Sequence, residues 1–380
     1  MRTAKLIILF AVSIILPFFT ESISPAVSEN NPPASSDTKK PFTVGMVVPL
    51  SGPLAFFGQD YMRAYELALA HRSELANLFS IRWEDSAYNP RQAISAFNKL
   101  LLVDNADLIY SFGGPMLNAL APLAEARKVP FYASESEKDD CEGRKFCVLF
   151  RNERREWGEA TWYALRKRGF KNLAIVKNQN QFMNSFVNGI IETKRGDESV
   201  SILIDAPPGT VDLRTEVLKL RDTKFDAIGV YLLPDSHHGF INALRSIPKQ
   251  PLIFGVEELI HPENNRGNED LVEGALVIAP WVSPQYQDLF ESKYGSSAGF
   301  FYTAALYDFF NLLADTLKAN SAARGLNLIS LLRFPGIRTG VSGEYFVKVS
   351  DTGVTSYSFP IGIYRQGSPV VQDDVFQATR

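Results

Sequence analysis

The sequence predicts an α/β protein built of two lobes, each a doubly wound parallel sheet, joined by a three-segment hinge. Three observations support this prediction. Short apolar runs alternate with stretches of helical period, which is typical of right-handed crossovers between parallel strands. The alternation runs through two successive halves of the chain. The 380 residues also exceed one ordinary core of about 100–150 residues, so two lobes are expected.

The beginning of the chain has the three parts of an export signal. Arg2 and Lys5 supply positive charge, an apolar run covers 6–19, and small residues at 26–28 could precede cleavage. A retained anchor is the competing interpretation, but Pro17 interrupts the run, which is shorter than the roughly 20 apolar residues that span a bilayer. We therefore expect residues 1–28 to be a cleaved signal peptide, and residues 29–41, rich in Asn, Pro and Ser, to be a flexible leader.

The first half predicts four strands separated by three helices. The strands are expected at 43–48, 79–85, 108–111 and 131–133, and the helices at 60–75, 89–102 and 117–127. The first strand is apolar on both faces, as buried parallel strands are, and a tight turn, Ser51-Gly52-Pro53, follows it. Turns at the carboxyl ends of such strands are where open α/β sheets hold their ligands.

The second half repeats this organisation. Strands are expected at 173–176, 200–204, 227–232 and 252–254, and helices at 153–167, 181–194, 212–222 and 235–247. A single strand at 275–279, two helices at 284–294 and 301–318, and a hairpin-rich tail at 343–371 follow.

This last part must return to the lobes already formed, because a single strand cannot start a third sheet domain. We assign 42–150 with 283–338 to the first lobe, and 151–282 with 339–380 to the second. The chain then crosses between lobes near 147–152, 278–283 and 337–343. Three crossings make a hinge, and a hinged cleft is how two-lobed binding proteins close on a ligand.

Composition and net charge argue against nucleic acid and anionic lipid as partners. Hydrophobic residues make up 46% and charged residues 21% of the chain, and the net charge is −3. These values describe a soluble globular protein with no basic field for nucleic acid or anionic lipid. The two cysteines, Cys141 and Cys147, are expected to form a disulfide after export. Free thiols are the alternative, and a zinc site needs more ligands than this pair offers.

Catalytic and metal-binding interpretations are not supported. Gly295-Ser-Ser-Ala-Gly299 matches the hydrolase pattern G-x-S-x-G, but it follows a predicted helix instead of a strand, and no histidine comes after it. His237 and His238 would point about 100° apart on a helix, so they cannot readily share a metal, and we expect both on the surface. No catalytic residue, metal or cofactor is therefore expected.

Several stretches together resemble type I periplasmic solute-binding proteins of the branched-chain amino-acid class. They are VPLSGPLAFFG at 48–58, EDSAYNPRQA at 84–93, VLFR at 148–151, GVE at 255–257 and AALYD at 304–308. The resemblance covers about 42–371. It implies a periplasmic, monomeric receptor that delivers a captured small molecule to an ABC permease in the inner membrane. A sensor subunit that reports the solute to a membrane receptor has the same fold and remains the alternative.

The resemblance also indicates where the ligand would bind. In the family, hydroxyl residues after the third and fourth strands hold the α-carboxylate of an amino acid, and here those places hold Gly114 and Glu137. Backbone amides around Gly114, at a helix start, can still suit an anion. Glu257 falls where the family places the partner of the ligand's α-ammonium. With Glu135 and Glu137 it suggests a cationic or amine-bearing solute, although these two glutamates also fit a solvated run that Lys138 and Arg144 neutralise.

Aromatic residues at the expected cleft positions are Phe56, Phe57, Phe182 and Tyr302. They favour an apolar or ring-bearing ligand, with ordinary core packing as the alternative. Leu233 takes a place that is often polar or aromatic in relatives. We expect Phe57, Gly114, Glu135 and Glu137 on one jaw and Phe182, Leu233 and Glu257 on the other, with Tyr302 nearby. The ligand is then amino-acid-like, an amine or aromatic, and its identity stays open.

Overall fold

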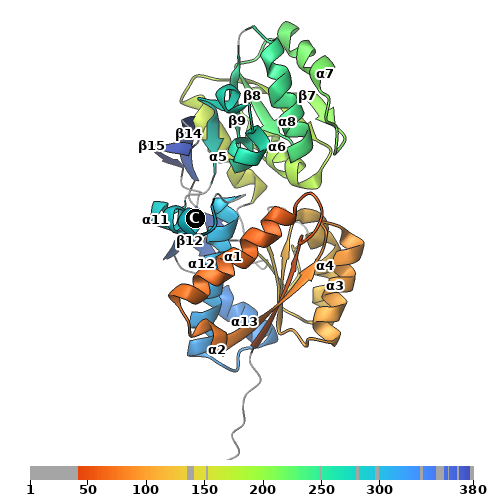
Figure 1. Ribbon diagram of the computed structural model, residues 1–380, viewed down its shortest axis with the longest axis vertical. Coiled ribbons are helices and arrows are strands. Elements are labelled where there is room, and N and C mark those ends of the chain that lie inside the picture. The colour runs from red at the N-terminus through yellow and green to blue at the C-terminus, as the bar shows by residue number, and fades with distance from the viewer. Residues whose placement is uncertain are drawn as a thin grey trace, which may run out of the picture. The chain divides into compact units, whose positions relative to one another are not determined.

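The architecture is taken from a computed structural model of the chain (Figure 1). It describes residues 42–134, 141–150, 153–248, 250–279, 282–295, 299–333, 337–347, 355–357, 359–365 and 368–376. The predicted signal peptide, 1–28, and leader, 29–41, lie outside these residues. Within the described part of the chain, no helix is both long enough and apolar enough to cross a membrane.

The first sheet has five parallel strands in the order β2-β1-β3-β4-β5. They are β1 (Phe42–Val48), β2 (Phe79–Asp85), β3 (Leu108–Phe112), β4 (Phe131–Ser134) and β5 (Cys147–Leu149). All seven residues of β1 are buried, because both of its faces are apolar and helices cover both sides of the sheet. The sequence did not predict β5, whose three residues are too few for a periodic signal.

Four helices connect these strands: α1 (Ala55–His71), α2 (Leu75–Leu78), α3 (Pro90–Leu102) and α4 (Gly114–Arg127). The start of α3 follows from its sequence. Asn89 accepts hydrogen bonds from the amides of Arg91 and Gln92, and Pro90 takes the first helical position, where its missing N–H costs nothing. In Figure 1, α1 and α12 (Phe300–Ala319) lie on one face of the sheet, and α3 and α4 on the other. Each face has its own apolar core.

The second sheet has a parallel part in the order β10-β9-β8-β6-β7, extended beyond β10 by an antiparallel pair, β14 and β15. Its strands are β6 (Asn172–Asn178), β7 (Ser199–Ala206), β8 (Ala227–Tyr231), β9 (Leu252–Gly255), β10 (Leu276–Ile278), β14 (Phe359–Arg365) and β15 (Ser368–Phe376).

The helical segments of this lobe are α5 (Arg154–Arg166), α6 (Gln181–Thr193), α7 (Arg214–Lys219), α8 (Pro234–Ala243), α9 (Pro262–Asn265), α10 (Glu269–Val272) and the short 3₁₀ turns η2 (Leu220–Asp222), η3 (Leu244–Ser246) and η4 (Glu257–Ile260). Residues of α5 and α6 form the core on one face of the sheet, and residues of α7 and α8 form the core on the other. The predicted class, two doubly wound α/β lobes, is therefore confirmed.

After β10 the chain returns to the first lobe through α11 (Pro284–Tyr294), α12 and α13 (Gly325–Leu332), whose buried residues join the core beside α1. A small third sheet follows, in the order β11-β12-β13, with β11 (Ile337–Gly340), β12 (Gly343–Val347) and β13 (Thr355–Tyr357). The lobe boundaries given above, at 150, 283 and 338, stay a prediction.

The predicted disulfide is confirmed: Cys141 and Cys147 are bonded, with their Cα atoms 5.4 Å apart. Arg333, just after α13, donates to the carbonyl of Cys147 at 2.6 Å and so ties this loop to the rest of the lobe. The surface position expected for His237 is wrong, because this side chain is 1% exposed and its Nε2 lies 3.1 Å from Oδ1 of Asn265. The buried imidazole is therefore hydrogen-bonded to the side-chain amide of Asn265, which lies 28 residues further along the chain.

Candidate ligand-binding cleft

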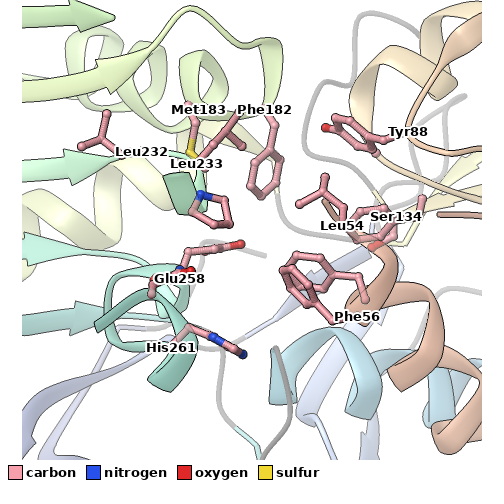
Figure 2. Close-up of a pocket in the computed structure, with 15 residues that line it drawn as sticks. Leu54, Phe56, Tyr88, Ser134, Phe182, Met183, Leu232, Leu233, Glu258 and His261 are labelled. Carbon is pink, nitrogen blue, oxygen red and sulfur yellow. Dashed lines mark hydrogen bonds between the residues drawn. The ribbon is translucent and has the colours of Figure 1, made fainter. Parts of the chain in front are cut away.

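A cavity of about 550 Å³, including its part that is open to solvent, lies where the strands of both sheets end. Ten of its fifteen lining residues are apolar or aromatic. The lining consists of Leu54, Phe56, Phe57, Tyr88, Phe112, Gly113, Ser134, Phe182, Met183, Leu232, Leu233, Pro234, Glu258, His261 and Asn264. Figure 2 shows Tyr88, Leu54 and Phe56 on one side and Phe182, Glu258 and His261 on the other.

The first-lobe wall is held by Asp85 at the end of β2. Its Oδ1 accepts hydrogen bonds from the amides of Leu50 at 2.8 Å, Ser51 at 3.2 Å and Ala87 at 2.7 Å. Burial opposes ionisation of this carboxyl, but these bonds and the Ser51 hydroxyl outweigh it and lower the pKa of Asp85. One carboxylate thus fixes both the turn that leads to Phe57 and the turn that carries Tyr88.

Tyr88 enters the cavity from an unusual backbone conformation. Ala87 has φ +43° and Tyr88 has φ +54°, so two successive non-glycine residues are left-handed. This conformation is uncommon outside glycine and costs about 1–3 kcal/mol per residue. It is held by the Asp85 bond to Ala87 and by the Ser86 hydroxyl, which accepts from the Tyr88 amide at 3.2 Å. The turn therefore stores strain to place this ring in the cleft.

The second-lobe wall is organised by Asn178, which is fully buried at the end of β6. Its Oδ1 accepts from the amide of Leu233 at 2.7 Å, and its Nδ2 donates to the Ser236 hydroxyl at 3.0 Å. The side chain of Asn180 caps α6 and accepts from the amide of Phe182 at 2.9 Å. These two asparagines set the positions from which Leu233 and Phe182 reach the cavity.

The polar corner of the cavity is formed by η4 and α9. Glu258 is 9% exposed, and its Oε1 accepts from the Tyr302 hydroxyl at 2.9 Å. Asn264 donates to the backbone carbonyl of Glu258 at 2.8 Å. The ring of His261 stacks on Phe56 of the first lobe, with centroids 5.7 Å apart and an interplanar angle of 28°. The corner therefore joins a carboxylate, an imidazole and an aromatic ring.

The residues expected at the site fall into four groups: those that line the cavity, those beside it, one that does not line it, and two outside the described residues. Phe57, Phe182 and Leu233 line the cavity. Gly114 is the first residue of α4, next to the lining residue Gly113, and Tyr302 lies behind the wall, 1% exposed and packed on Phe57 with centroids 5.6 Å apart.

Glu257 does not line the cavity. Its Oε2 accepts from the amide of Phe301 at the start of α12, 3.3 Å away. Glu135 and Glu137 lie outside the described residues. For every residue expected at the site, contact with a ligand stays a prediction.

The start of α4 offers an anion less than the sequence suggested. Pro115 has no N–H, and the amides of Met116 and Leu117 both donate to the carbonyl of Gly113 at 3.1 Å. The first turn of this helix is thus largely satisfied by its own backbone. The expected capacity to hold a carboxylate there is reduced to the amide of Gly114 and the residues around it.

Sequence reasoning did not predict ten of the lining residues: Leu54, Tyr88, Phe112, Ser134, Met183, Leu232, Pro234, Glu258, His261 and Asn264. One signal, position at the end of a strand, could have found two of them. Phe112 and Ser134 end β3 and β4, and strand ends were already the expected place of the cleft. The polar corner had no such signal, because it depends on how η4 and α9 fold after β9. Among the described residues, no group of three or more His, Cys, Asp or Glu is placed to hold a metal ion.

Two α/β lobes that enclose an apolar cavity at their strand ends define the class of two-lobed ligand-binding proteins. A family model described as periplasmic binding protein matches residues 41–333. The chain belongs to this family. Comparison with curated protein sequences gives no match.

Solved structures of solute-binding proteins share the fold. One from Rhodopseudomonas palustris BisB5, in complex with 3,4-dihydroxybenzoic acid, has a TM-score of 0.77 at 18% identity, covering 89% of this chain and 98% of its own. The leucine-binding protein of Thermotoga maritima has a TM-score of 0.76 at 17% identity, covering 88% and 98%. A protein from R. palustris with 4-hydroxybenzoate has 0.75 at 17%, covering 88% and 97%. The expected family is confirmed.

Proposed function

We propose that the protein is the exported solute-binding receptor of an ABC importer. It closes its lobes on a small, largely apolar or ring-bearing solute and delivers it, without chemical change, to a permease in the inner membrane. In this proposal the protein is periplasmic and monomeric. The family supports the class of function, and the ABC-transporter proteins that share its fold support the permease as partner.

The observation that carries the proposal is the pairing of aromatic walls across the cavity. Phe57 comes from the first turn of α1 and Phe182 from the start of α6, so the two rings belong to different lobes. Burying one such ring contributes roughly 1.5–3 kcal/mol. Two or three rings could supply much of the about 8 kcal/mol that micromolar affinity requires. A ligand held by both walls also stabilises the closed arrangement of the lobes.

Calorimetry on the purified mature protein tests the proposal with a panel of aliphatic amino acids, aromatic acids and aromatic amines. We expect at least one class to bind with micromolar affinity and to make the protein more compact in small-angle scattering. In Phe182→Ala, loss of one ring contact should weaken that binding roughly 10- to 100-fold. Phe225→Ala is the matched control, because Phe225 is also partly buried but packs on the other face of the same sheet.

Transport is tested by adding the liganded protein to proteoliposomes that hold a candidate ABC permease and its ATPase. Stimulated ATP hydrolysis that requires both protein and ligand supports the receptor function. A protein that binds no member of the panel, with scattering that is unchanged throughout, would contradict it.

A further inference from the structure

The ring of Tyr88 lies across the end of β1, at the point where the chain switches from one side of this strand to the other. In the first sheet β1 lies between β2 and β3. Tyr88 follows β2, and its ring packs on Gly113, which follows β3. The contact between them therefore spans the carboxyl end of β1. Open α/β sheets form their ligand crevice at such a switch point, and here an aromatic side chain occupies it.

The contacts around this ring fix its position. The backbone is left-handed at two successive residues, and the side chains of Asp85 and Ser86 hold it through the hydrogen bonds described above. Gly113 forms the surface beneath the ring, where a Cβ would lie 2.6 Å from Cε2 of Tyr88. The ring of Phe112 lies beside it, with centroids 6.3 Å apart. A ligand therefore meets a fixed wall at Tyr88.

Tyrosine is an unfavourable residue for this backbone conformation. Glycine adopts positive φ without steric cost, and of the other residues asparagine, aspartate and histidine are found there most often. Tyr88 is partly buried, packs on both cores of the first lobe and lines the cavity. Strained residues of this kind cluster at ligand sites, where the surrounding structure holds them. The strain is therefore a reason to assign the ring a role in the cleft.

Removal of the ring would extend the cavity instead of creating a separate one. Gly113 and Phe112, which the ring contacts, line the same cavity as Tyr88. The Cε atom of Met116 lies 3.4 Å from the Cβ position of Gly113 and bounds this space on the side of α4. The volume that the ring fills is thus continuous with the volume open to a ligand.

We infer that Tyr88 determines the length of ligand that the cleft accepts. Its ring closes the crevice of the first lobe, so a ligand lies in the remaining space, which Figure 2 shows between Phe56 and Phe182. This inference rests on the proposed receptor function and adds a specificity-determining residue to it. Without the ring, a longer ligand can enter the crevice, and each additional CH₂ that it buries there strengthens binding roughly fourfold.

Short and long members of each ligand class test this limit by calorimetry. The pairs are benzoate and 4-phenylbenzoate, benzylamine and 4-phenylbenzylamine, and leucine and 2-aminodecanoate. For the class that binds, Tyr88→Gly should raise the affinity for the long member relative to the short one roughly tenfold or more. Tyr88→Phe keeps the ring and should leave this ratio within about twofold of the wild-type value. If Tyr88→Gly does not fold, Tyr88→Asn, which also tolerates positive φ, should give the same shift.

The affinity ratio separates ligand selection from a role in stability alone. Loss of packing that only loosens the lobe would weaken long and short ligands alike. An unchanged ratio, or loss of binding to both members, in the folded Tyr88→Gly protein therefore overturns the inference and leaves the receptor function in place. An equal shift in Tyr88→Phe also overturns it, because the ring would not be the cause. Absence of wild-type binding to every pair and to the whole earlier panel removes both proposals.

Discussion

The ring of Tyr88 packs against the backbone of Gly113 so closely that any side chain at residue 113 would collide with it. A Cβ built on Gly113 lies 2.6 Å from Cε2 and 3.4 Å from Cζ of Tyr88. Gly113 has φ +95° and Tyr88 has φ +54°. The turns that follow β2 and β3 therefore interlock at the cleft, each in a conformation that depends on the other.

Gly113→Ala should destabilise the protein more than the same change at a glycine with open surroundings. Gly169→Ala is the matched control, because Gly169 has φ +76° and nothing within 4 Å of a built Cβ. Backbone strain alone is about 1–3 kcal/mol at either position. The excess at residue 113 should largely disappear in a Tyr88→Ala background, measured as the free energy of unfolding in urea. Equal effects at 113 and 169 would show that the ring imposes no constraint.

The turns after β2 and β3 illustrate how much of the cleft can be predicted from the sequence. Strand 43–48 and the turn after it were predictable, because an apolar run followed by Ser51-Gly52-Pro53 is a local signal. Tyr88 was not, because its place depends on the absence of a side chain 25 positions later. Phe57, Phe182 and Leu233, which the family resemblance and their places after strands indicated, line the cavity, and their contact with a ligand stays a prediction.

Glu257 and Glu258 of η4 show more clearly which side-chain positions the sequence pattern does not predict. Their position after β9 was predictable, but which of them reaches the cleft depends on Phe301 and Tyr302, 44 residues further along the chain. The buried histidine has the same explanation, since Asn265 lies 28 residues from His237. Local pattern therefore predicts which elements border the cleft, whereas long-range hydrogen bonds decide which side chains face it.

Removal of the disulfide should weaken the first lobe. The bond between Cys141 and Cys147 closes a loop with a sequence separation of 6, for which the chain-entropy model gives about 2 kcal/mol. We expect the double variant Cys141→Ser, Cys147→Ser to lose stability by about this amount in urea unfolding. Reductant should destabilise the wild-type protein to a similar degree and leave the variant unchanged. A wild-type curve that does not respond to reductant, although labelling finds two free thiols in the treated protein and none in the untreated protein, would count against this.

His237 should make the protein less stable as the pH falls. Burial lowers the pKa of this imidazole from 6.5 to about 4, against the hydrogen bond with Asn265, which raises it. Between these values the unfolded chain binds more protons than the native state, so stability rises with pH. Across the whole window the effect is about 3 kcal/mol. His237→Gln should remove it, as measured by urea unfolding at closely spaced pH values from 4.5 to 6.5. A variant that keeps the wild-type slope would contradict the assignment.

Asp308 should make the protein less stable as the pH rises, which is the opposite of the effect of His237, over nearly the same pH range. On α12, this carboxylate accepts from the amides of Val341 at 3.0 Å and Ser342 at 2.8 Å and from the Ser342 hydroxyl, fixing the turn between β11 and β12. Burial outweighs these bonds and raises its pKa from 3.8 to about 6. The native state therefore holds its proton to higher pH than the unfolded chain, and stability falls as the pH rises through this window, by about 3 kcal/mol in total.

Because the Asp308 and His237 contributions oppose each other, their sum in the wild-type protein should change little between pH 4.5 and 6. Asp308→Asn leaves His237 unopposed, so its stability should rise with pH, whereas His237→Gln leaves Asp308 unopposed and should show a fall. The double variant should restore a shallow profile, because the two sites lie on different elements, α12 and α8, and their effects should add. Single variants with slopes of the same sign would mean that at least one of these two groups does not titrate as its burial requires.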